Sequence, residues 1–477
     1  MASALVWLRG DLRMADNPAL DHACNEHDDV VPVFAWHARD GDAWALGTAS
    51  RWWLSHSLRA LDKSLRKAGN ALVLLRGCAV TELPALAQKA GAKAVYWNRV
   101  YEPAAMAQER EVEAALQAAG VATRAFNASL LHEPWHSGKK DGEPYLVFTP
   151  FWRALMTRGE PEEPLPAPEI VPWKRERTPL LKVEDLDIEP SLPADAHLAE
   201  EWKPGESGAQ QALARFLEVC AAYAVDRERP DVTGTSRLSP HLRFGEIGPR
   251  QVWHALRNHM ERKVSAERGC DALLRQIVWR EFGYHLLHHH PNLPDQCLRP
   301  EFARFPWKRE ERLLHAWQQG RTGYPIVDAA MRELAASGWM HNRSRMLAAS
   351  FLVKHLLQPW QDGARWFWDR LVDADLANNT LGWQWVSGCG ADAAPYFRIF
   401  NPVLQGRKFD PDGAYVRRWL PELRNVPAAC IHEPWKAPAA VLSAAGVRLG
   451  EHYPEPIVAH DSARRAALAA YATISRP

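Results

Sequence analysis

The sequence has few of the features that mark secreted, membrane-bound or zinc-binding proteins. Its seven cysteines form no CxxC pair and no regular framework, which argues against a disulfide scaffold or a zinc site and favours a reducing compartment. No segment approaches the about 18 consecutive apolar residues of a membrane span. The apolar run at 4–8 ends at Arg9 and is too short for a signal peptide. We expect a cytoplasmic protein that does not associate with membranes.

An excess of charge of either sign is also absent. Lysine and arginine number 58, and aspartate and glutamate number 57, so any surface that binds nucleic acid has to be local. The length of 477 residues exceeds what one hydrophobic core usually supports, which predicts two or three domains. Most of the 22 tryptophans are expected to be packing residues. A functional role for any one of them has to rest on its neighbours.

Two histidine clusters have the spacing of metal ligands, but neither predicts a metal site. Residues 132–136 match the HExxH zinc pattern, yet Pro134 breaks the helical turn that the pattern needs. Pro291 ends the helix that would carry the second cluster. We expect its side chains to lie near a helix C-terminus, where imidazolium is favoured: His285, His288 and His289.

Short apolar runs in residues 1–130 predict the strands of a parallel sheet, and amphipathic patterns between them predict helices. The strand and helix patterns are, in chain order, 4–8, 30–36, 51–68, 71–75, 94–97 and 104–119. This alternation predicts a doubly wound α/β domain. The domain lacks the GxGxxG turn of a dinucleotide-binding fold, which disfavours a nicotinamide site there.

The chain changes character twice after residue 130. Nine prolines fall within 161–204 among many charges, so we expect 131–204 to be a connector that wraps over the surface. Helical patterns then dominate residues 205–477 and predict an all-helical domain. The predicted helices are 209–223, 249–259, 269–288, 325–337 and 339–357.

Polar groups that suit a phosphorylated ligand occur in this helical half. A turn at Gly234 that ends at Pro240 brings together three hydroxyls, from Thr235, Ser236 and Ser239. Such a turn can hold phosphate oxygens, although it is more often a plain helix cap. Arg280 and Arg345 add permanent positive charges that could neutralise a pyrophosphate.

Two further stretches suit a bound ring system. Helical spacing puts four side chains on one face, where they need buried partners: Asn342, Arg345, Met346 and Ala349. Residues 373–379 are rich in short polar groups and lead into Trp383-Gln384-Trp385. Two large rings beside a polar cluster favour a redox cofactor over ordinary core packing.

The blocks 234–240, 338–346 and 373–385, together with 7–13 and 417–423, resemble the photolyase/cryptochrome family of flavin-dependent, light-driven proteins. The resemblance implies that the helical domain binds FAD in a U shape, with the adenine folded toward the isoalloxazine. The residues that match the family's FAD contacts are Tyr223, Thr235, Ser236, Leu238, Ser239, Arg280, Asn342, Arg345, Asp373, Asp375 and Asn379.

The resemblance also assigns individual roles around the flavin. Asp373 would pair with Arg345, and the Asn379 amide would face flavin N5. A neutral amide tolerates a reduced anionic flavin, whereas plant cryptochromes carry aspartate at this position, so Asn379 favours repair. The family's chain of oxidisable rings from flavin to surface matches Trp383, Trp360 and Trp307.

A pocket for a flipped pyrimidine dimer is implied as well. Trp279 and Trp385 match its aromatic walls and Met346 its floor. Arg343 and Arg398 match residues that hold the DNA backbone or fill the vacated base stack. Phosphate contacts would make binding salt-dependent and indifferent to sequence.

Gln276 departs from the main class of cyclobutane dimer photolyases, which carry glutamate there. Glutamine still accepts and donates hydrogen bonds, but it supplies neither a proton nor an anionic acceptor. Asn342 and Met346 occupy the positions where (6-4) photolyases carry histidines used in acid catalysis, so the sequence does not support the (6-4) reaction.

The sequence therefore predicts a monomeric DNA photolyase that splits cyclobutane pyrimidine dimers with an electron from photoexcited reduced FAD. The alternative is a cryptochrome-like blue-light photoreceptor with a signalling partner. The end of the chain at Pro477, with no long tail, favours repair, and Gln276 favours sensing. The resemblance also implies a second, antenna chromophore in the N-terminal domain, either a folate or a deazaflavin.

Overall fold

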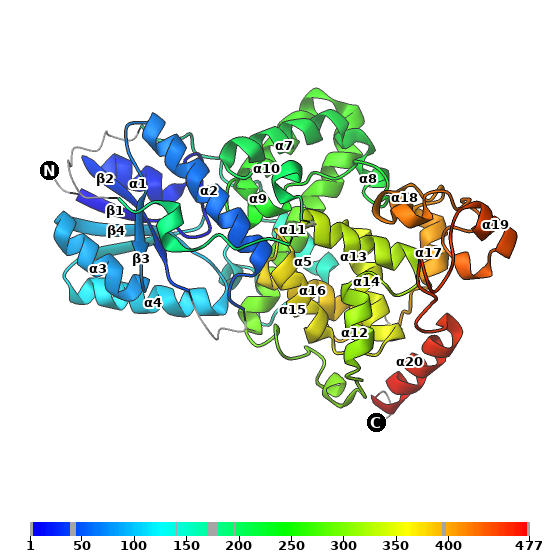
Figure 1. The fold of residues 1–477 in the computed structure, drawn as a ribbon. Coiled ribbons are helices and arrows are strands. Elements are labelled where there is room, and N and C mark those ends of the chain that lie inside the picture. Colours follow the sequence, from blue (N-terminus) through cyan, green and yellow to red (C-terminus); the bar gives the residue numbers. More distant parts are fainter. Residues whose placement is uncertain are drawn as a thin grey trace.

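The computed structural model describes residues 3–38, 44–139, 141–169, 180–193, 196–393 and 397–474. A parallel sheet lies at one side of the molecule, and a larger body of helices lies at the other (Figure 1). The strand order is β3-β2-β1-β4-β5. The strands are β1 Ser3–Trp7, β2 Asp29–Trp36, β3 Val73–Arg76, β4 Ala92–Asn98 and β5 Ala122–Phe126.

Alternate side chains of the strands enter two different cores, which is the signature of a sheet covered on both faces. Ala4 and Val6 pack with helices α1 (Pro18–Glu26) and α2 (Thr48–Lys67). Leu5 and Trp7 pack with α3 (Ala79–Ala90) and α4 (Pro103–Ala118). The doubly wound α/β prediction is confirmed. The sequence patterns missed α1, α3 and β5. Strand β5 is only half buried and carries no apolar run.

The helical body confirms the all-α prediction for the second half of the chain. Its longer elements are α7 Glu206–Val219, α10 Pro249–Arg262, α11 Glu267–His289, α12 Glu311–Gln318, α13 Pro325–Ser337, α14 Asn342–Ser350, α15 Trp360–Arg370, α16 Leu376–Ser387, α17 Pro402–Phe409 and α20 His460–Ile474. Shorter helices include α8 Tyr223–Asp226, α9 Ser239–Arg243, α18 Ala414–Trp419 and α19 Ala439–Ala444. No helix in the described part of the chain is both long and apolar enough to cross a bilayer.

The prediction of one helix over 339–357 is wrong at both ends. Gly338 adopts a left-handed φ of 65° and ends α13, and the side chain of His341 then caps α14 by accepting from the Arg343 backbone N–H at 3.1 Å. At the other end, α14 passes into a π-helical turn, η6 (Phe351–His355). The break places Asn342 in the first turn of its own helix.

The predicted connector, 131–204, contains buried helices in its described part. Helix α5 (Phe148–Met156) buries Phe148, Phe151 and Leu155 in the core of the helical body. A 3-10 turn, η2 (Val183–Leu186), buries Val183 and Leu186 beside α2. The connector therefore contributes to both cores.

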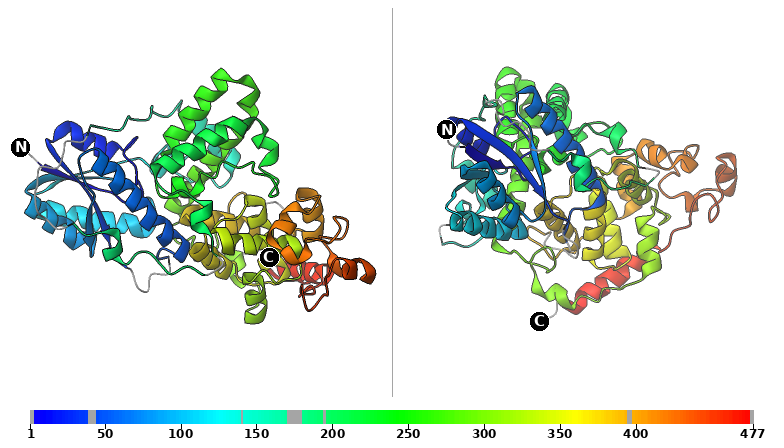
Figure 2. Two further views of the ribbon diagram at one scale, coloured as in Figure 1. Left: turned by 45° about the horizontal axis from the view of Figure 1, so that its top comes forward. Right: turned by 60° about the vertical axis from the view of Figure 1, so that its left-hand side comes forward.

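Helix α2 joins the two parts of the molecule. The Trp53 indole N–H donates to the Glu246 carboxylate at 2.9 Å, and Thr48 donates through its backbone N–H and hydroxyl to Asp369. At the far end of the chain, α20 packs along the helical body (Figure 2) and joins η6 through a 2.9 Å contact between His460 and His355. The helical body is therefore hydrogen-bonded to α2 of the α/β domain and to the C-terminal helix α20.

Candidate functional site

A cavity of about 590 Å³ opens in the helical body between α11, α14 and α16. Its volume lies within the about 300–1,000 Å³ typical of ligand pockets. All eleven residues that the sequence matched to FAD contacts line this cavity. These residues are spread along the sequence from Tyr223 to Asn379, and the fold brings them together around one cavity.

Helix α16 supplies one wall of the cavity. Asp375 caps the helix by accepting from the Asn378 backbone N–H at 2.8 Å, and its other oxygen accepts from the Tyr284 hydroxyl at 2.5 Å. The side-chain N–H of Asn379 donates to the Ala364 carbonyl at 3.0 Å, which fixes the amide. Gly382 lines the cavity, and a Cβ atom added there would meet nothing within 4 Å. This wall is therefore smooth enough for a flat ring.

The turn at Gly234–Ser239 supplies hydroxyls to another wall. Gly234 is required because a Cβ atom would lie 2.5 Å from the Cβ of Asp226. Pro240 does not end the turn as predicted; it lies in the first turn of α9, where proline is well tolerated because no helical N–H partner is needed.

Arg345 and Asp373 form the ion pair that the resemblance implied. The guanidinium donates to both carboxylate oxygens, at 2.8 and 3.1 Å, and also to the Met340 carbonyl at 2.8 Å. Arg280 reaches the cavity from α11 while it donates to the Ser129 carbonyl at 2.6 Å. Both cations are thus fixed before any anion binds.

Sequence reasoning missed three further arginines that line the cavity: Arg227, Arg237 and Arg243. The Arg237 guanidinium lies 4.2 Å from the ring centre of Trp202 and 4.4 Å from that of Trp339, and burial lowers its pKa. Arg237 stands within the conspicuous 234–240 block and has a left-handed φ of 56°, which the sequence did not predict. The positive charge of these three arginines did not indicate, from the sequence alone, that they line the cavity.

Four of the six residues predicted to contact the lesion also line the cavity: Gln276, Trp279, Met346 and Trp385. Trp279 stacks on Phe148 with ring centres 3.8 Å apart and planes 5° apart. The Trp385 indole N–H donates to the Asp392 carbonyl at 3.0 Å. These contacts hold the two aromatic walls in place.

Arg343 and Arg398 are not among the described residues that line the cavity. Arg343 pairs with Glu228 and lies 4.3 Å over the Phe409 ring. Arg398 is exposed, and its backbone carbonyl accepts from Lys354 at 2.7 Å. A role at the outer surface is compatible with both positions.

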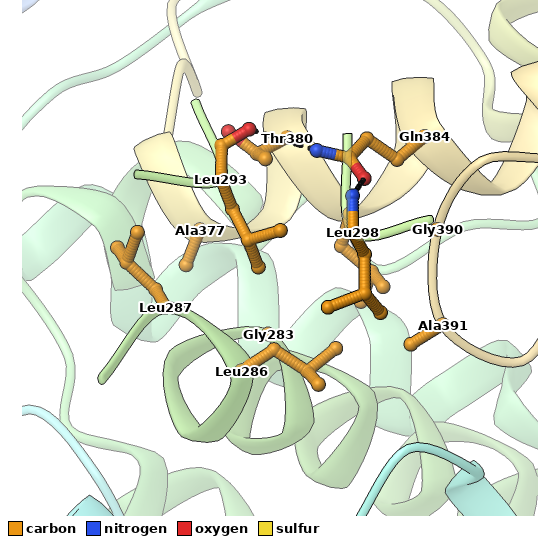
Figure 3. Close-up of a pocket in the computed structure, with 11 residues that line it drawn as sticks. Gly283, Leu286, Leu287, Leu293, Leu298, Ala377, Thr380, Gln384, Gly390 and Ala391 are labelled. Atoms are coloured by element: carbon orange, nitrogen blue, oxygen red, sulfur yellow. Dashed lines mark hydrogen bonds between the residues drawn. The ribbon is translucent and has the colours of Figure 1, made fainter. Parts of the chain in front are cut away.

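Gln384 anchors α16 between the two tryptophans. Its buried side chain donates to the Leu293 carbonyl at 2.8 Å and accepts from the Leu298 N–H at 3.0 Å (Figure 3). The small pocket around this clamp is lined mainly by leucines, glycines and alanines. The Gln384 side chain faces the loop that carries Leu293 and Leu298, whereas its neighbours Trp383 and Trp385 line the cavity.

Of the three tryptophans of the predicted electron route, the two inner ones are buried and the outer one is half-buried. Trp383 lines the cavity and is 2 % exposed, and its ring tip packs on Gly363 of α15. Trp360 begins the same helix, is fully buried and donates to Cys297 Sγ at 3.3 Å. Trp307 is half-buried, and the next residue, Lys308, donates to the Leu357 carbonyl at 2.7 Å. The fold therefore brings together the segments that carry these three tryptophans.

Comparison with known proteins agrees with this geometry. A model described as "DNA photolyase" matches residues 4–169, and one described as "FAD binding domain of DNA photolyase" matches residues 273–473. The chain is 46% identical to a deoxyribodipyrimidine photo-lyase of Agrobacterium fabrum, over 100% of this chain and 98% of that protein. The chain belongs to the photolyase/cryptochrome family.

Solved structures and plant relatives place the chain within this photolyase/cryptochrome family. A class III photolyase from Agrobacterium tumefaciens superposes with a TM-score of 0.95 at 46% identity and covers 100% of this chain, which in turn covers 98% of it. Cryptochrome-1 of Arabidopsis thaliana is 41% identical over 97% of this chain and 69% of its own length. Both branches of the family are therefore similar to this protein.

The residues present fit the FAD that this family binds. The cavity is lined by hydroxyls and arginines, and also by Gly382, where a Cβ atom would meet nothing within 4 Å, and by the Trp383 ring. The indole nitrogen of Trp383 is buried without a partner among the described residues. Buried polar atoms normally have partners, so this nitrogen is consistent with a cavity built to hold a polar ring.

Proposed function

We propose that this protein is a deoxyribodipyrimidine photo-lyase that repairs cyclobutane pyrimidine dimers in DNA. The observation that carries the proposal is that a single cavity gathers the flavin-type residues and the aromatic walls Trp279 and Trp385. FAD, when bound and reduced, supplies the photoexcited electron that splits the dimer.

The chain's own residues bind and orient the reacting groups. Arg345, held by Asp373, and Arg280 neutralise the pyrophosphate, and the fixed amide of Asn379 presents its oxygen to the flavin ring. Trp279 and Trp385 receive a dimer that has left the duplex, because transfer of an electron needs close approach. The Gln276 amide, whose N–H lies 3.5 Å from the Ala272 carbonyl, orients the bases.

Trp383, Trp360 and Trp307 carry electrons from the surface to the flavin and so restore its reduced form. The partial exposure of Trp307 beside the burial of Trp360 and Trp383 supports this direction, since only the outer member can meet reductants in solvent. We also infer that the protein acts as a cytoplasmic monomer and that the N-terminal domain binds an antenna chromophore, either a folate or a deazaflavin.

Light-dependent repair of an oligonucleotide with one cyclobutane thymine dimer tests the proposal. The purified protein would be reduced, illuminated with blue light and assayed beside the same oligonucleotide with a (6-4) lesion. Repair of the dimer alone is the expected result. Normal photoreduction of the flavin with no repair of either lesion would overturn the proposal and favour the photoreceptor.

A further inference from the structure

A cysteine contacts the middle tryptophan of the proposed electron route. The Trp360 indole N–H donates to Cys297 Sγ at 3.3 Å, and the ring itself is fully buried. Electron transfer falls steeply with distance, so a sulfur atom in contact with this ring reaches it more directly than a reductant in solvent. An oxidised indole is also acidic at its nitrogen, and that N–H already points at the sulfur. Cys297 is therefore well placed to give an electron to Trp360.

A second thiol lies against the first, because the S–H of Cys389 donates a hydrogen bond to Cys297. Gln384 holds the segments that carry both cysteines. Its side chain donates to the Gln296 carbonyl at 2.8 Å and accepts from the Leu298 N–H at 3.0 Å (Figure 3). Its backbone carbonyl accepts from the Cys389 N–H at 3.1 Å. One residue thus fixes the chain on either side of Cys297 and the backbone of Cys389.

The two thiols differ in how readily they ionise. The hydrogen bond from Cys389 lowers the pKa of Cys297 against the opposing effect of burial, and the bond from Trp360 lowers it further. Burial raises the pKa of Cys389 well above its usual value. Burial also lowers the pKa of Lys354, which interacts with Cys389, to about 7, so this amine can accept the Cys389 proton. Cysteine reactivity follows the thiolate, which makes Cys297 the first electron donor of the pair.

Another buried thiol pair lacks these features. Cys270 donates to Cys220, with the two sulfur atoms 3.7 Å apart. Burial raises the pKa of Cys270 to about 12, and neither sulfur hydrogen-bonds to a tryptophan in the part of the chain that the structure describes. These thiols have the ordinary character of small buried apolar groups. They provide a matched comparison within the same protein.

We propose that Cys297 and Cys389 form a dithiol that supplies electrons to the flavin through Trp360 and becomes a disulfide. The proposal rests on the proposed route from Trp383 through Trp360. The Cys297 sulfur gives one electron to oxidised Trp360, and formation of the S–S bond with Cys389 releases a second electron by the same route after a second excitation. In total the two thiols lose two electrons and two protons, which balances a two-electron reduction of the flavin. A small-molecule thiol then regenerates the dithiol by exchange at the half-buried Cys297.

Illumination of the FAD-loaded protein, without oxygen and without added reductant, tests the proposal. Absorbance should show reduction of the flavin by two electrons per protein. Alkylation after denaturation should show a loss of two free thiols from the seven of the chain, and peptide mass spectrometry should find the disulfide between residues 297 and 389. A sample kept in the dark should retain all seven thiols. The thiol count is a readout that does not depend on any activity of the protein.

Two sets of variants identify the donor. Cys297→Ser leaves an acceptor for the Trp360 N–H but removes the thiol, so both the thiol loss and the reduction of the flavin should disappear. An excess of small-molecule thiol should restore flavin reduction in this variant, because Trp307 still meets solvent. Cys220→Ser with Cys270→Ser is the matched control and should still lose two thiols in light.

The outcomes separate this proposal from the repair proposal. Full reduction of the flavin with all seven thiols intact, no reduction without added reductant, or equal oxidation of Cys220 and Cys270 would overturn the dithiol. Thiol loss that persists in Trp360→Phe would also overturn it, since the electrons would then leave by another path. Normal oxidation of the dithiol in a protein that repairs no dimer would support the dithiol and overturn the repair proposal.

Discussion

Gly363 and Gly382 allow the same change, glycine to alanine, to be tested at two places. At Gly363 the new methyl group meets the Trp383 ring, and at Gly382 it enters the cavity. In Gly363→Ala the new methyl would lie 2.1 Å from the Trp383 ring and 2.6 Å from Leu352. Carbon atoms in contact lie about 3.5–4.0 Å apart, so the ring has to move by more than about 1 Å. Overpacking of this kind costs about 1–3 kcal/mol, partly offset by the gain of about 1 kcal/mol from alanine in a helix.

Gly382→Ala is the matched control, because its methyl meets no protein atom within 4 Å and enters the cavity. Without FAD, this variant gains helix propensity and should be more stable than the unmodified protein by up to about 1 kcal/mol. With FAD, it should bind the cofactor more weakly, because the methyl occupies space that the flavin needs. The expected order of apoprotein stability is Gly382→Ala, unmodified protein, Gly363→Ala.

Thermal denaturation measures the stability of the apoproteins, and FAD titration measures their affinity for the cofactor. The rate of light-driven flavin reduction reports on the position of the Trp383 ring. Gly363→Ala should photoreduce slowly, because the ring nearest the flavin is displaced. Unchanged stability and unchanged photoreduction in Gly363→Ala would refute the packing of Trp383 on α15. Unchanged FAD affinity in Gly382→Ala would refute the position of the flavin against α16.

Three other changes have definite expected outcomes. Trp360→Phe should abolish photoreduction measured by absorbance, yet leave dimer repair by chemically reduced protein unchanged; loss of both activities would contradict a route that serves reduction alone. Gln276→Glu adds an anionic acceptor in the cavity and should raise the quantum yield of dimer repair, and an unchanged yield would show that the amide already suffices. Burial lowers the pKa of Lys354 to about 7, below the about 10.4 of an unfolded lysine. Between these pH values the unfolded chain binds more protons than the folded protein, so the free energy of unfolding should rise with pH by up to about 1.4 kcal/mol per unit. Denaturant titrations at several pH values measure this rise. If the free energy of unfolding of Lys354→Met rises with pH as steeply as that of the unmodified protein, the prediction is contradicted.

Local patterns in the sequence predicted elements well where one periodicity dominates. The helix expected over 325–337 begins and ends at those residues, since Pro325 fits the first turn and Gly338 the stop. Patterns failed where burial is partial or where neighbours decide the structure. Strand β5 is half exposed, and α5 carries Pro150 in its first turn. The boundaries at 130 and 204 stay predictions that limited proteolysis can check.

The candidate site could be predicted only through the family resemblance. Gln276 and Trp385 stand on different helices, and nothing in their spacing brings them into one cavity. The resemblance also omitted Arg237, which has a left-handed backbone and lines the cavity, and it did not predict that Glu228 pairs with Arg343. Tertiary contacts determine both features.

The shared cavity explains why repair and light sensing are hard to separate in this family. The residues predicted to contact FAD and the proposed route from Trp383 to Trp307 would serve either activity, so they do not discriminate between repair and light sensing. Discrimination has to come from the side that faces DNA. There, Trp279 is stacked on Phe148, and the Trp385 indole N–H donates to the Asp392 carbonyl. Two rigid aromatic walls suit a pyrimidine dimer that has left the duplex, so repair of such a dimer is the activity that can decide between the two branches.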